Sequence, residues 1–344
     1  MVYNIFMKAW VIAKINEPLR LLEMDIPFPD YKEILIKIHA CGVCHTELDE
    51  IEGRAMPAFF PVIPGHQIVG EVVKVGSAVK KFKVGDRAGV GWIYSACGKC
   101  EYCLKGLENL CKDFKATGKD AHGGYAEYFK IHEDFAFPIP ENFANEEAAP
   151  LFCAGAIGYR SLMLAKVENK QNIGLIGFGA SGHLVLKMIK YLYPDSNVFV
   201  FSRTLSERQL SMKLGAYWTG DFDETPPEKL NSAIDTTPVW KPPIKVLKHL
   251  KPAGRLVINA IRKEEIDKNE FLNINYQKDL WLEKEIKSVA NVTRKDIEEF
   301  LKIASQIPIK PEIEIYSFED ANKALKDIKE RKIKGAKVLK IGGE

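Results

Sequence analysis

A glycine-rich turn near the middle of the chain is the feature that most restricts the fold. It matches the pattern G-x-G-x-x-G and consists of Gly177, Phe178, Gly179, Ala180, Ser181 and Gly182. The apolar run 173–176 before it is typical of a buried strand, and segment 184–191 after it has the pattern of a helix. In this context the glycines let backbone amides approach a pyrophosphate, and the helix N-terminus offers unpaired N–H groups to its charge. The turn therefore predicts a dinucleotide site.

The segments after the turn continue the alternation of strand and helix. Apolar strands are expected at 198–201, 233–235 and 255–259, with a helix at 206–214. This alternation favours an α/β fold, with a doubly wound parallel sheet that carries helices on both faces, as in a Rossmann domain.

The segments before the turn have a different pattern of predicted secondary structure. Short strands alternate with glycine turns and indicate a β-barrel-like first domain; we expect them at 7–13, 33–39, 68–75 and 86–90. The tail of the chain is expected to hold two helices, at 297–304 and 319–331, and two strands, at 312–315 and 337–341.

The end of the second apolar strand bears on the choice of dinucleotide. An NAD site usually has an acidic residue there, which bonds the 2′-hydroxyl of the adenosine ribose. This chain has Ser202 and Arg203 instead. A guanidinium can hold a 2′-phosphate with two parallel hydrogen bonds, whereas a carboxylate would repel it. We therefore expect NADP(H) to be favoured over NAD(H); the alternative is that Arg203 stacks on adenine and either cofactor binds.

Four cysteines form the most specific metal signal by spacing alone. They are Cys97, Cys100, Cys103 and Cys111. Four thiolates close a tetrahedral shell around zinc and leave no position for substrate, so such a site is structural. An iron–sulfur centre is the competing metal, because thiolates hold both.

Three other stretches carry residues able to hold a second metal ion. Cys44 is followed by His45 and Thr46, His66 follows a glycine turn, and Cys153 lies among apolar and small residues. A catalytic zinc needs three such protein ligands and an open fourth position. Singly, each residue also has a plain structural interpretation, as a turn histidine or a small buried side chain.

Taken together, these stretches resemble those of the zinc-dependent medium-chain alcohol dehydrogenase family, in the same order and at the same spacings along the whole chain. The resemblance implies that Cys44, His66 and Cys153 hold a catalytic zinc and that the four cysteines hold a structural zinc, which makes two Zn²⁺ per chain. It also implies a GroES-like catalytic domain at 1–155 and 295–344, with a four-cysteine lobe at 95–113, and a Rossmann coenzyme-binding domain at 156–294.

The resemblance implies an activity as well: reversible hydride transfer between a primary or secondary alcohol and the nicotinamide cofactor. Thr46 matches the hydroxyl of the family's proton relay, and Asp49 stands where many relatives have the histidine that ends it. His45 and Arg294 match positions that contact the pyrophosphate. Trp92 is implied as a lining residue of the substrate pocket.

Two departures and two further lining residues complete the expected site. Glu47 stands where the family usually has an aspartate bonded to the zinc histidine, and Gln67 stands where a glutamate usually follows that histidine. Phe59 and Phe114 are candidates for the substrate pocket because they are close in sequence to the ligand stretches. Cys41 is expected to be a small buried side chain.

Composition restricts the partners. A net charge of +3, with 28% charged and 46% hydrophobic residues, predicts a globular protein without a broad basic face for nucleic acid or membrane. No apolar run approaches the roughly 20 residues needed to span a bilayer. The start Met1–Phe6 lacks a signal-peptide pattern, so we expect a cytoplasmic protein whose cysteines are metal ligands or reactive thiols rather than disulfides. Expected partners are a small-molecule alcohol, aldehyde or ketone and further copies of the chain, in a homodimer or homotetramer.

Competing functions come from the same residues. Cys41, Cys44 and His45 also fit C-x-x-C-H, the attachment motif of c-type haem. That function requires an oxidising compartment, which the expected location does not offer. The four cysteines alone would also fit a zinc-ribbon nucleic-acid binder, which the charge balance disfavours. Polyol dehydrogenases and quinone oxidoreductases are disfavoured by Cys153 and the four-cysteine lobe.

Overall fold

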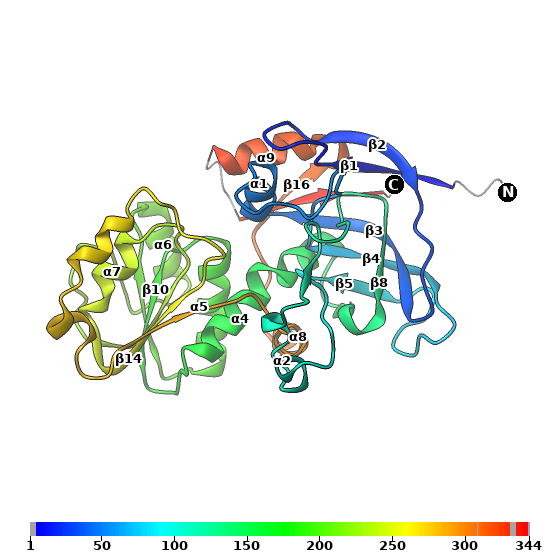
Figure 1. Cartoon of the computed structure of the whole chain (residues 1–344). Coiled ribbons are helices and arrows are strands. Elements are labelled where there is room, and N and C mark those ends of the chain that lie inside the picture. Colours follow the sequence, from blue (N-terminus) through cyan, green and yellow to red (C-terminus); the bar gives the residue numbers. More distant parts are fainter. Residues whose placement is uncertain (1–4, 308, 331–334, 343–344) are drawn as a thin grey trace. The chain divides into compact units, whose positions relative to one another are not determined.

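The computed structural model describes residues 5–307, 309–330 and 335–342. The chain divides into two units (Figure 1). Unit 1 comprises Met1–Cys153, Val292–Ser305 and Lys310–Glu344, and unit 2 comprises Ala154–Asn291 and Gln306–Ile309. The domain limits expected from the sequence stay a prediction. Two parts of the sequence predictions lie outside the described residues. They are residues 1–4, where no signal-peptide pattern was found, and Arg331, the last residue of an expected helix.

Unit 2 is built on a sheet whose strands follow the order β12-β11-β10-β13-β14-β15, with all neighbours parallel. The strands are β10 (Asn172–Ile176), β11 (Asn197–Phe201), β12 (Trp218–Gly220), β13 (Leu230–Asp235), β14 (Leu250–Ile258) and β15 (Glu285–Ser288). The helical segments are α4 (Ala154–Leu164), α5 (Ala180–Leu192), α6 (Leu205–Lys213), α7 (Lys241–Leu247), η4 (Lys268–Asn273) and η5 (Tyr276–Leu280). The predicted doubly wound parallel sheet is confirmed.

Strand β10, in the interior of this sheet, shows why its strands could be predicted from the sequence. Every residue of β10 is buried, as expected for a parallel strand covered on both faces. The chain order reverses between β10 and β13, and ligands of such sheets bind beyond the carboxyl ends of the strands at this switch point. Edge strand β15 is exposed along its whole length, so it lacks the apolar run that reveals a buried strand.

Unit 1 contains a mainly antiparallel sheet with seven strands among the described residues. Its order is β16-β17-β3-β4-β5-β9, and β8 also pairs with β3. The strands are β3 (Glu33–Val43), β4 (Ile68–Val75), β5 (Arg87–Val90), β8 (Tyr128–His132), β9 (Phe137–Pro138), β16 (Ile313–Ser317) and β17 (Ala336–Lys340). Two smaller antiparallel pairs are β1 (Phe6–Val11) with β2 (Arg20–Asp25) and β6 (Ile93–Ser95) with β7 (Lys115–Ala116).

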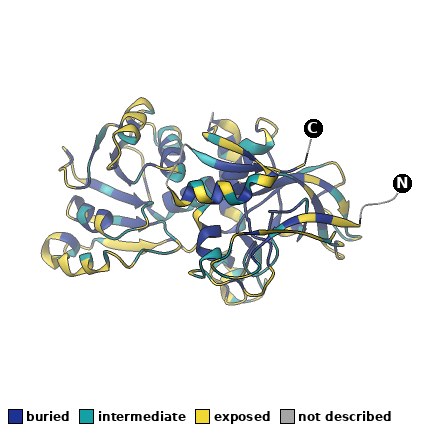
Figure 2. Ribbon diagram, turned by 90° about the horizontal axis from the view of Figure 1, so that it is seen from above, coloured by how far each residue is buried: buried dark blue, intermediate teal, exposed yellow. Residues whose placement is uncertain are grey.

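The helices of unit 1 are short except for two near the end of the chain. They are α1 (His45–Ile51), α2 (Glu101–Leu104), α3 (Asn145–Ala148), α8 (Arg294–Gln306) and α9 (Ala321–Lys329), with single turns η1 (Glu108–Leu110), η2 (Glu133–Phe135), η3 (Ala149–Phe152) and η6 (Phe318–Asp320). In α9, Ala321, Ala324, Leu325 and Ile328 are buried, which is the apolar stripe of a surface helix. Figure 2 shows the same division across the molecule: buried residues are concentrated in the inner strands, and the outer faces of helices are exposed.

The tail of the chain completes the sheet of unit 1. Strand β17 pairs antiparallel with the last residues of β3, so that Lys337 lies opposite Val43. In Figure 1 the orange and red elements α9 and β16 accordingly lie beside blue elements of the N-terminal half, with α9 next to α1. This pairing supports β3 at the point where it leads into Cys44.

Candidate metal and cofactor sites

Three segments of unit 1 bring Cys44, His66 and Cys153 together. Cys44 follows β3 and caps the N-terminus of α1, His66 lies just before β4, and Cys153 follows η3. One donor atom from each lies within 4.8 Å of the others. Zinc bonds sulfur at about 2.3 Å and imidazole nitrogen at about 2.0 Å, so donor atoms this close fit one shared ion. We call these residues the Cys-His-Cys group.

The carboxylate of Glu47 orients the histidine of this group. One of its oxygens lies 2.8 Å from His66 Nδ1, and the other accepts the backbone N–H of Cys44 at 2.8 Å. Glu47 is fully buried and His66 is 2% exposed. Because Nδ1 faces Glu47, Nε2 is the nitrogen left for a metal, and the carboxylate fixes the ring.

The pKa values of the group reflect its burial and its charges. Burial by itself lowers the pKa of His66, but the charge of Glu47 and the Cys44 side chain outweigh it and raise that pKa well above its usual range. The contact with Cys153, followed by burial, raises the pKa of Cys44. Without metal, the group therefore holds protons that a metal ion must displace.

Thr46 and Asp49, the expected relay residues, both lie on α1. The Cys44 thiol donates to Thr46 Oγ1 at 3.3 Å, so the hydroxyl is beside the metal group. Asp49 is 7% exposed and accepts a hydrogen bond from Arg54 Nε at 2.5 Å. Arg54 was not among the site residues expected from the sequence. His45, expected at the pyrophosphate, is exposed on the first turn of α1.

The residues expected to line the substrate pocket have different immediate surroundings, and their role in a substrate pocket stays a prediction. Trp92 is 7% exposed and its ring meets that of His66 edge to face at 5.0 Å, so it packs on the metal group. Phe114 is half-buried in a turn, where its N–H donates to the carbonyl of Cys111. Gln67 is buried, and its side chain lies where a Cβ on Gly42 would be.

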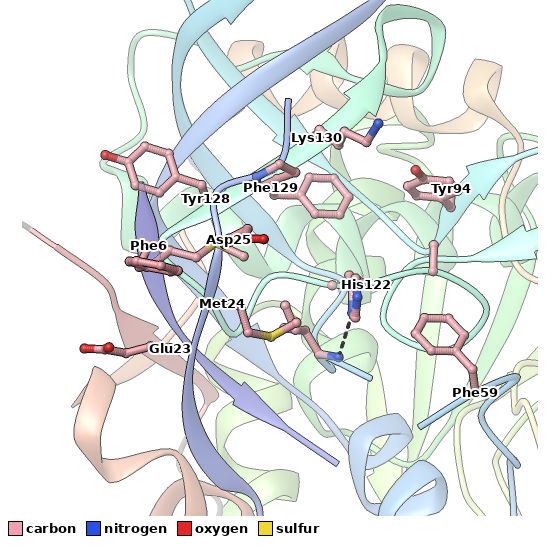
Figure 3. A pocket seen from close by; sticks show the side chains of 15 residues that line it. Phe6, Glu23, Met24, Asp25, Phe59, Tyr94, His122, Tyr128, Phe129 and Lys130 are labelled. Atoms are coloured by element: carbon pink, nitrogen blue, oxygen red, sulfur yellow. Dashed lines mark hydrogen bonds between the residues drawn. The ribbon is translucent and has the colours of Figure 1, made fainter. Parts of the chain in front are cut away.

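Phe59 lines a different hollow of unit 1, a cavity of about 560 Å³. Figure 3 shows its ring near His122, whose Nδ1 accepts the N–H of Ile63 at 3.2 Å. The lining also includes Tyr94 and Phe129, but neither Trp92 nor a residue of the Cys-His-Cys group. Of the three residues expected to line the substrate pocket, this cavity is lined by Phe59 but not by Trp92 or Phe114.

The four cysteines of the lobe also converge. The sulfur atoms of Cys97, Cys100, Cys103 and Cys111 all lie within 4.8 Å of one another. The backbone N–H groups of Lys99 and Cys100 lower the pKa of Cys97 to about 6, whereas burial and the neighbouring thiols raise that of Cys103 to about 12. A preformed thiolate held by backbone N–H groups, among three further sulfur atoms, fits a closed tetrahedral metal site.

A salt bridge connects Glu108 of the lobe to Arg294, which is the residue of α8 expected to contact the pyrophosphate. Glu108, on η1 between the third and fourth cysteines, is 3% exposed. One of its oxygens accepts from both the backbone N–H and Nε of Arg294, at 2.8 and 3.0 Å. The sequence reasoning missed this acid, because its partner is distant in the chain.

In unit 2, the glycine turn has the geometry of a pyrophosphate cradle. Gly177 has φ +81°, and a Cβ on Gly182 would lie 2.7 Å from the Gly177 carbonyl oxygen, so only glycines allow the helix to start this close to the strand. A Cβ on Gly179, by contrast, would meet no atom within 4 Å, so the backbone there faces open space. Gly179 caps α5, which begins at Ala180, and the Ser181 hydroxyl donates to the carbonyl of Ala154.

The residues expected to select the dinucleotide follow β11. Ser202 is 2% exposed, and Arg203 beside it is exposed. Among the described residues no acidic side chain pairs with the Arg203 guanidinium. The Ser202 hydroxyl, however, donates to the carboxylate of Glu207, a residue that the sequence reasoning missed.

Comparisons with known proteins agree with this arrangement. Residues 30–141 match the family described as the alcohol dehydrogenase GroES-like domain. A probable alcohol dehydrogenase of Mycobacterium tuberculosis is 38% identical, and the alignment covers 97% of each chain. An alcohol dehydrogenase of Geobacillus stearothermophilus is 34% identical over 97% of this chain and 100% of that protein. The structure of a Sorghum bicolor cinnamyl alcohol dehydrogenase is similar with a TM-score of 0.87 and 26% identity over 98% of both chains.

These matches confirm the predicted fold class, since the family match falls on the GroES-like part and the structural likeness extends over the Rossmann part. Among the described residues, every helix is too short or too polar to cross a bilayer. With relatives of this identity matched over nearly their full length, the chain belongs to the zinc-dependent medium-chain alcohol dehydrogenase family, and it is an oxidoreductase with alcohol dehydrogenase activity.

Proposed function

We propose that this enzyme is a zinc-dependent dehydrogenase that transfers a hydride reversibly between a primary or secondary alcohol and a nicotinamide cofactor, with NADP(H) favoured. The observation that supports it best is the convergence of Cys44, His66 and Cys153, with Glu47 on the second nitrogen of the histidine. Two thiolates and one imidazole form the ligand set of a catalytic zinc with an open fourth position.

When bound, the zinc would act as a Lewis acid on the substrate oxygen, and the nicotinamide would accept or donate the hydride. Cys44, His66 and Cys153 would hold the ion. Glu47 keeps the imidazole in one orientation, and the ring of Trp92 packs edge to face on that imidazole. A histidine fixed in this way needs little rearrangement to bind a metal ion.

We propose that Thr46 moves the proton of the alcohol. Its hydroxyl contacts Cys44 Sγ, so it is close to the position that the substrate oxygen would take. Asp49 is three residues further along α1, and its carboxylate is paired with Arg54. Because Arg54 already binds this carboxylate, we propose that Asp49 has a smaller role in proton transfer than Thr46.

We propose a second, structural zinc in the four-cysteine lobe, where all four ligand positions are protein sulfurs. Through Glu108 the folded lobe also holds Arg294. This supports a role for the lobe in positioning an arginine that, by the family resemblance, contacts the pyrophosphate together with His45.

For the cofactor, we propose that Gly177, Gly179, Ala180, Ser181 and Gly182 cradle the pyrophosphate and that Ser202 and Arg203 face the adenosine ribose. The exposed guanidinium of Arg203 supports NADP(H). The assignment of unit 1 as the catalytic domain and unit 2 as the coenzyme domain is part of the same proposal. Exposed edge strand β15 supports association of the chain with further copies.

The test is a panel of alcohols, aldehydes and ketones on purified, zinc-loaded enzyme, with NADP(H) and NAD(H) measured separately. We expect kcat/KM to be higher with NADP(H) than with NAD(H). Metal analysis should find about two zinc ions per chain. Turnover should be lost when a chelator removes the zinc ion of the Cys-His-Cys group. Equal activity in fully zinc-free protein would reject the metal-dependent function. A clear preference for NADH would reject the cofactor preference alone.

A further inference from the structure

The carboxylate of Glu207 lies at the place where a dinucleotide-binding domain recognises the adenosine ribose. Ser202 is the first residue after β11, and its N–H donates to the carbonyl of Gly220 at 2.9 Å, so the sheet holds its backbone. Its hydroxyl accepts the N–H of Thr204 at 3.2 Å. Since the oxygen is already an acceptor, its own proton is free to be donated, and Glu207 accepts it.

This contact changes the electrostatics expected from the sequence. The residue after the second strand of a Rossmann sheet is the usual source of the acid that bonds the ribose 2′-hydroxyl, and here it is a serine. Glu207 lies five positions later, in the first turn of α6 (Leu205–Lys213), yet it reaches back to that serine. A negative charge is therefore present at the end of β11 even though no acid occupies the usual position.

The same short segment carries a positive charge. Arg203 is exposed, and within the described part of the chain no carboxylate neutralises it, whereas Glu207 is half-buried against Ser202. A 2′-phosphate carries up to two negative charges, so Arg203 attracts it and Glu207 repels it. A free 2′-hydroxyl has the opposite response, because it can donate a hydrogen bond to the carboxylate.

We propose that Glu207 is a second specificity-determining residue of the cofactor site, which opposes Arg203. Its carboxylate, held by Ser202, accepts the 2′-hydroxyl of NAD(H) and weakens binding of the 2′-phosphate of NADP(H). The enzyme consequently uses both cofactors. Its preference depends on whether the attraction of the 2′-phosphate by Arg203 is stronger than its repulsion by Glu207. This inference rests on the proposed cofactor site at the end of β11.

The decisive experiment isolates the 2′ group with two nucleotide fragments, 5′-AMP and 2′,5′-ADP. Their Kd values are measured by calorimetry on the full chain for the native enzyme, Glu207→Gln, Arg203→Ala and Ser202→Ala. We expect Glu207→Gln to tighten 2′,5′-ADP by at least about fivefold and to leave 5′-AMP unchanged or weaker. Arg203→Ala should weaken 2′,5′-ADP by a similar factor, and Ser202→Ala, which releases the carboxylate, should resemble Glu207→Gln with a smaller effect.

The matched control is Glu228→Gln, which removes the same charge from unit 2. Glu228 accepts a hydrogen bond from Asn172, the first residue of β10, whereas the glycine turn follows the last residue of that strand. We expect this variant to leave both Kd values unchanged. The ratio of kcat/KM for NADPH and NADH in zinc-loaded enzyme should follow the fragment affinities in every variant.

Two results would overturn the inference. One is a ratio of 2′,5′-ADP to 5′-AMP affinity that does not change in Glu207→Gln. The other is an equal change in Glu207→Gln and Glu228→Gln, which would indicate a general effect of net charge. A native enzyme that prefers NADH would reject the proposed NADP(H) preference and leave the role of Glu207 intact, because that role concerns the direction of change upon substitution.

Discussion

The Cys-His-Cys group collects its donors from segments that lie between residues 44 and 153, whereas the four-cysteine lobe takes all of its donors from one loop between residues 97 and 111. The first group has three donors, a hydroxyl beside them at Thr46 and a buried carboxylate behind the histidine. The second has four sulfur donors and no position left for a substrate. We propose that this difference separates a site that exchanges a ligand from one that holds a loop.

The largest loss of activity is expected from a substitution in the Cys-His-Cys group, and it tests whether this group is the reactive one. Replacing Cys153 by alanine should lower kcat/KM by at least about 10³-fold, because loss of the Lewis acid removes several kcal/mol of transition-state stabilisation. The variant should contain one zinc fewer by metal analysis. Cys41→Ala is the matched control, since Cys41 is buried on β3 outside both groups, and it should retain activity. A fully active Cys153→Ala variant would contradict the comparison.

A smaller loss of activity is expected from the hydroxyl that only the first group possesses. Thr46→Ala should lower kcat by at least about 10²-fold, the low end of general acid–base contributions, whereas Thr46→Ser should recover most of it. Asp49→Ala should change the pH profile only modestly, because Arg54 already neutralises that carboxylate. Steady-state rates between pH 6 and 10 measure both effects. A nearly neutral Thr46→Ala variant would show that the proton leaves by another route.

The pH dependence of zinc binding should differ between the two sites. The pKa values of Cys44 and His66 are raised, so both carry protons near neutral pH, and zinc must displace them. The affinity of the Cys-His-Cys group should therefore rise with pH by at least about tenfold per unit between pH 6 and 8. In the lobe, Cys97 has a pKa of about 6 and is already ionised over most of this range. Titration of metal-free protein with a competing chelator measures the two dependences, and equal slopes would contradict the distinction.

The smallest effect on turnover is expected from the lobe itself. Cys100→Ser should remove the lobe zinc and lower Tm by at least about 5 °C, since structural zinc contributes folding free energy. At a temperature where the variant is folded, kcat should stay within about threefold of the native value, because no lobe cysteine belongs to the reactive group. KM for the cofactor is expected to rise modestly through the contact of Glu108 with Arg294. A loss of kcat as large as that of Cys153→Ala would contradict the distinction between a reactive and a structural metal site.

Much of this arrangement was predictable, for reasons that particular residues make clear. The lobe cysteines are close in sequence, so their spacing alone indicates a metal site. The glycine turn is identified by its neighbours, because β10 is apolar throughout and α5 follows at once. The Cys-His-Cys group required the family resemblance, since neither periodicity nor spacing relates Cys44 to Cys153.

Other features could not be predicted from the chain. Phe59 and Trp92 are both aromatic residues expected at the substrate pocket, yet Trp92 packs on His66, whereas Phe59 lines a cavity that includes neither Trp92 nor His66 (Figure 3). Strand β15 escaped detection because an exposed edge strand has no apolar run. Both outcomes depend on which surfaces face each other after folding.

By itself, the sequence determined the alternation of buried strands and helices, the glycine turn between β10 and α5 and the clustering of the four lobe cysteines, because these depend on patterns that extend over a few neighbouring residues. Only the tertiary structure decided which charges meet: Glu47 with His66, Glu108 with Arg294, and Glu207 with Ser202. The physical reason is that an ion pair or hydrogen bond requires atoms within about 3 Å. Sheet pairing and the start of each helix set such distances, and these features arise from contacts between distant parts of the chain.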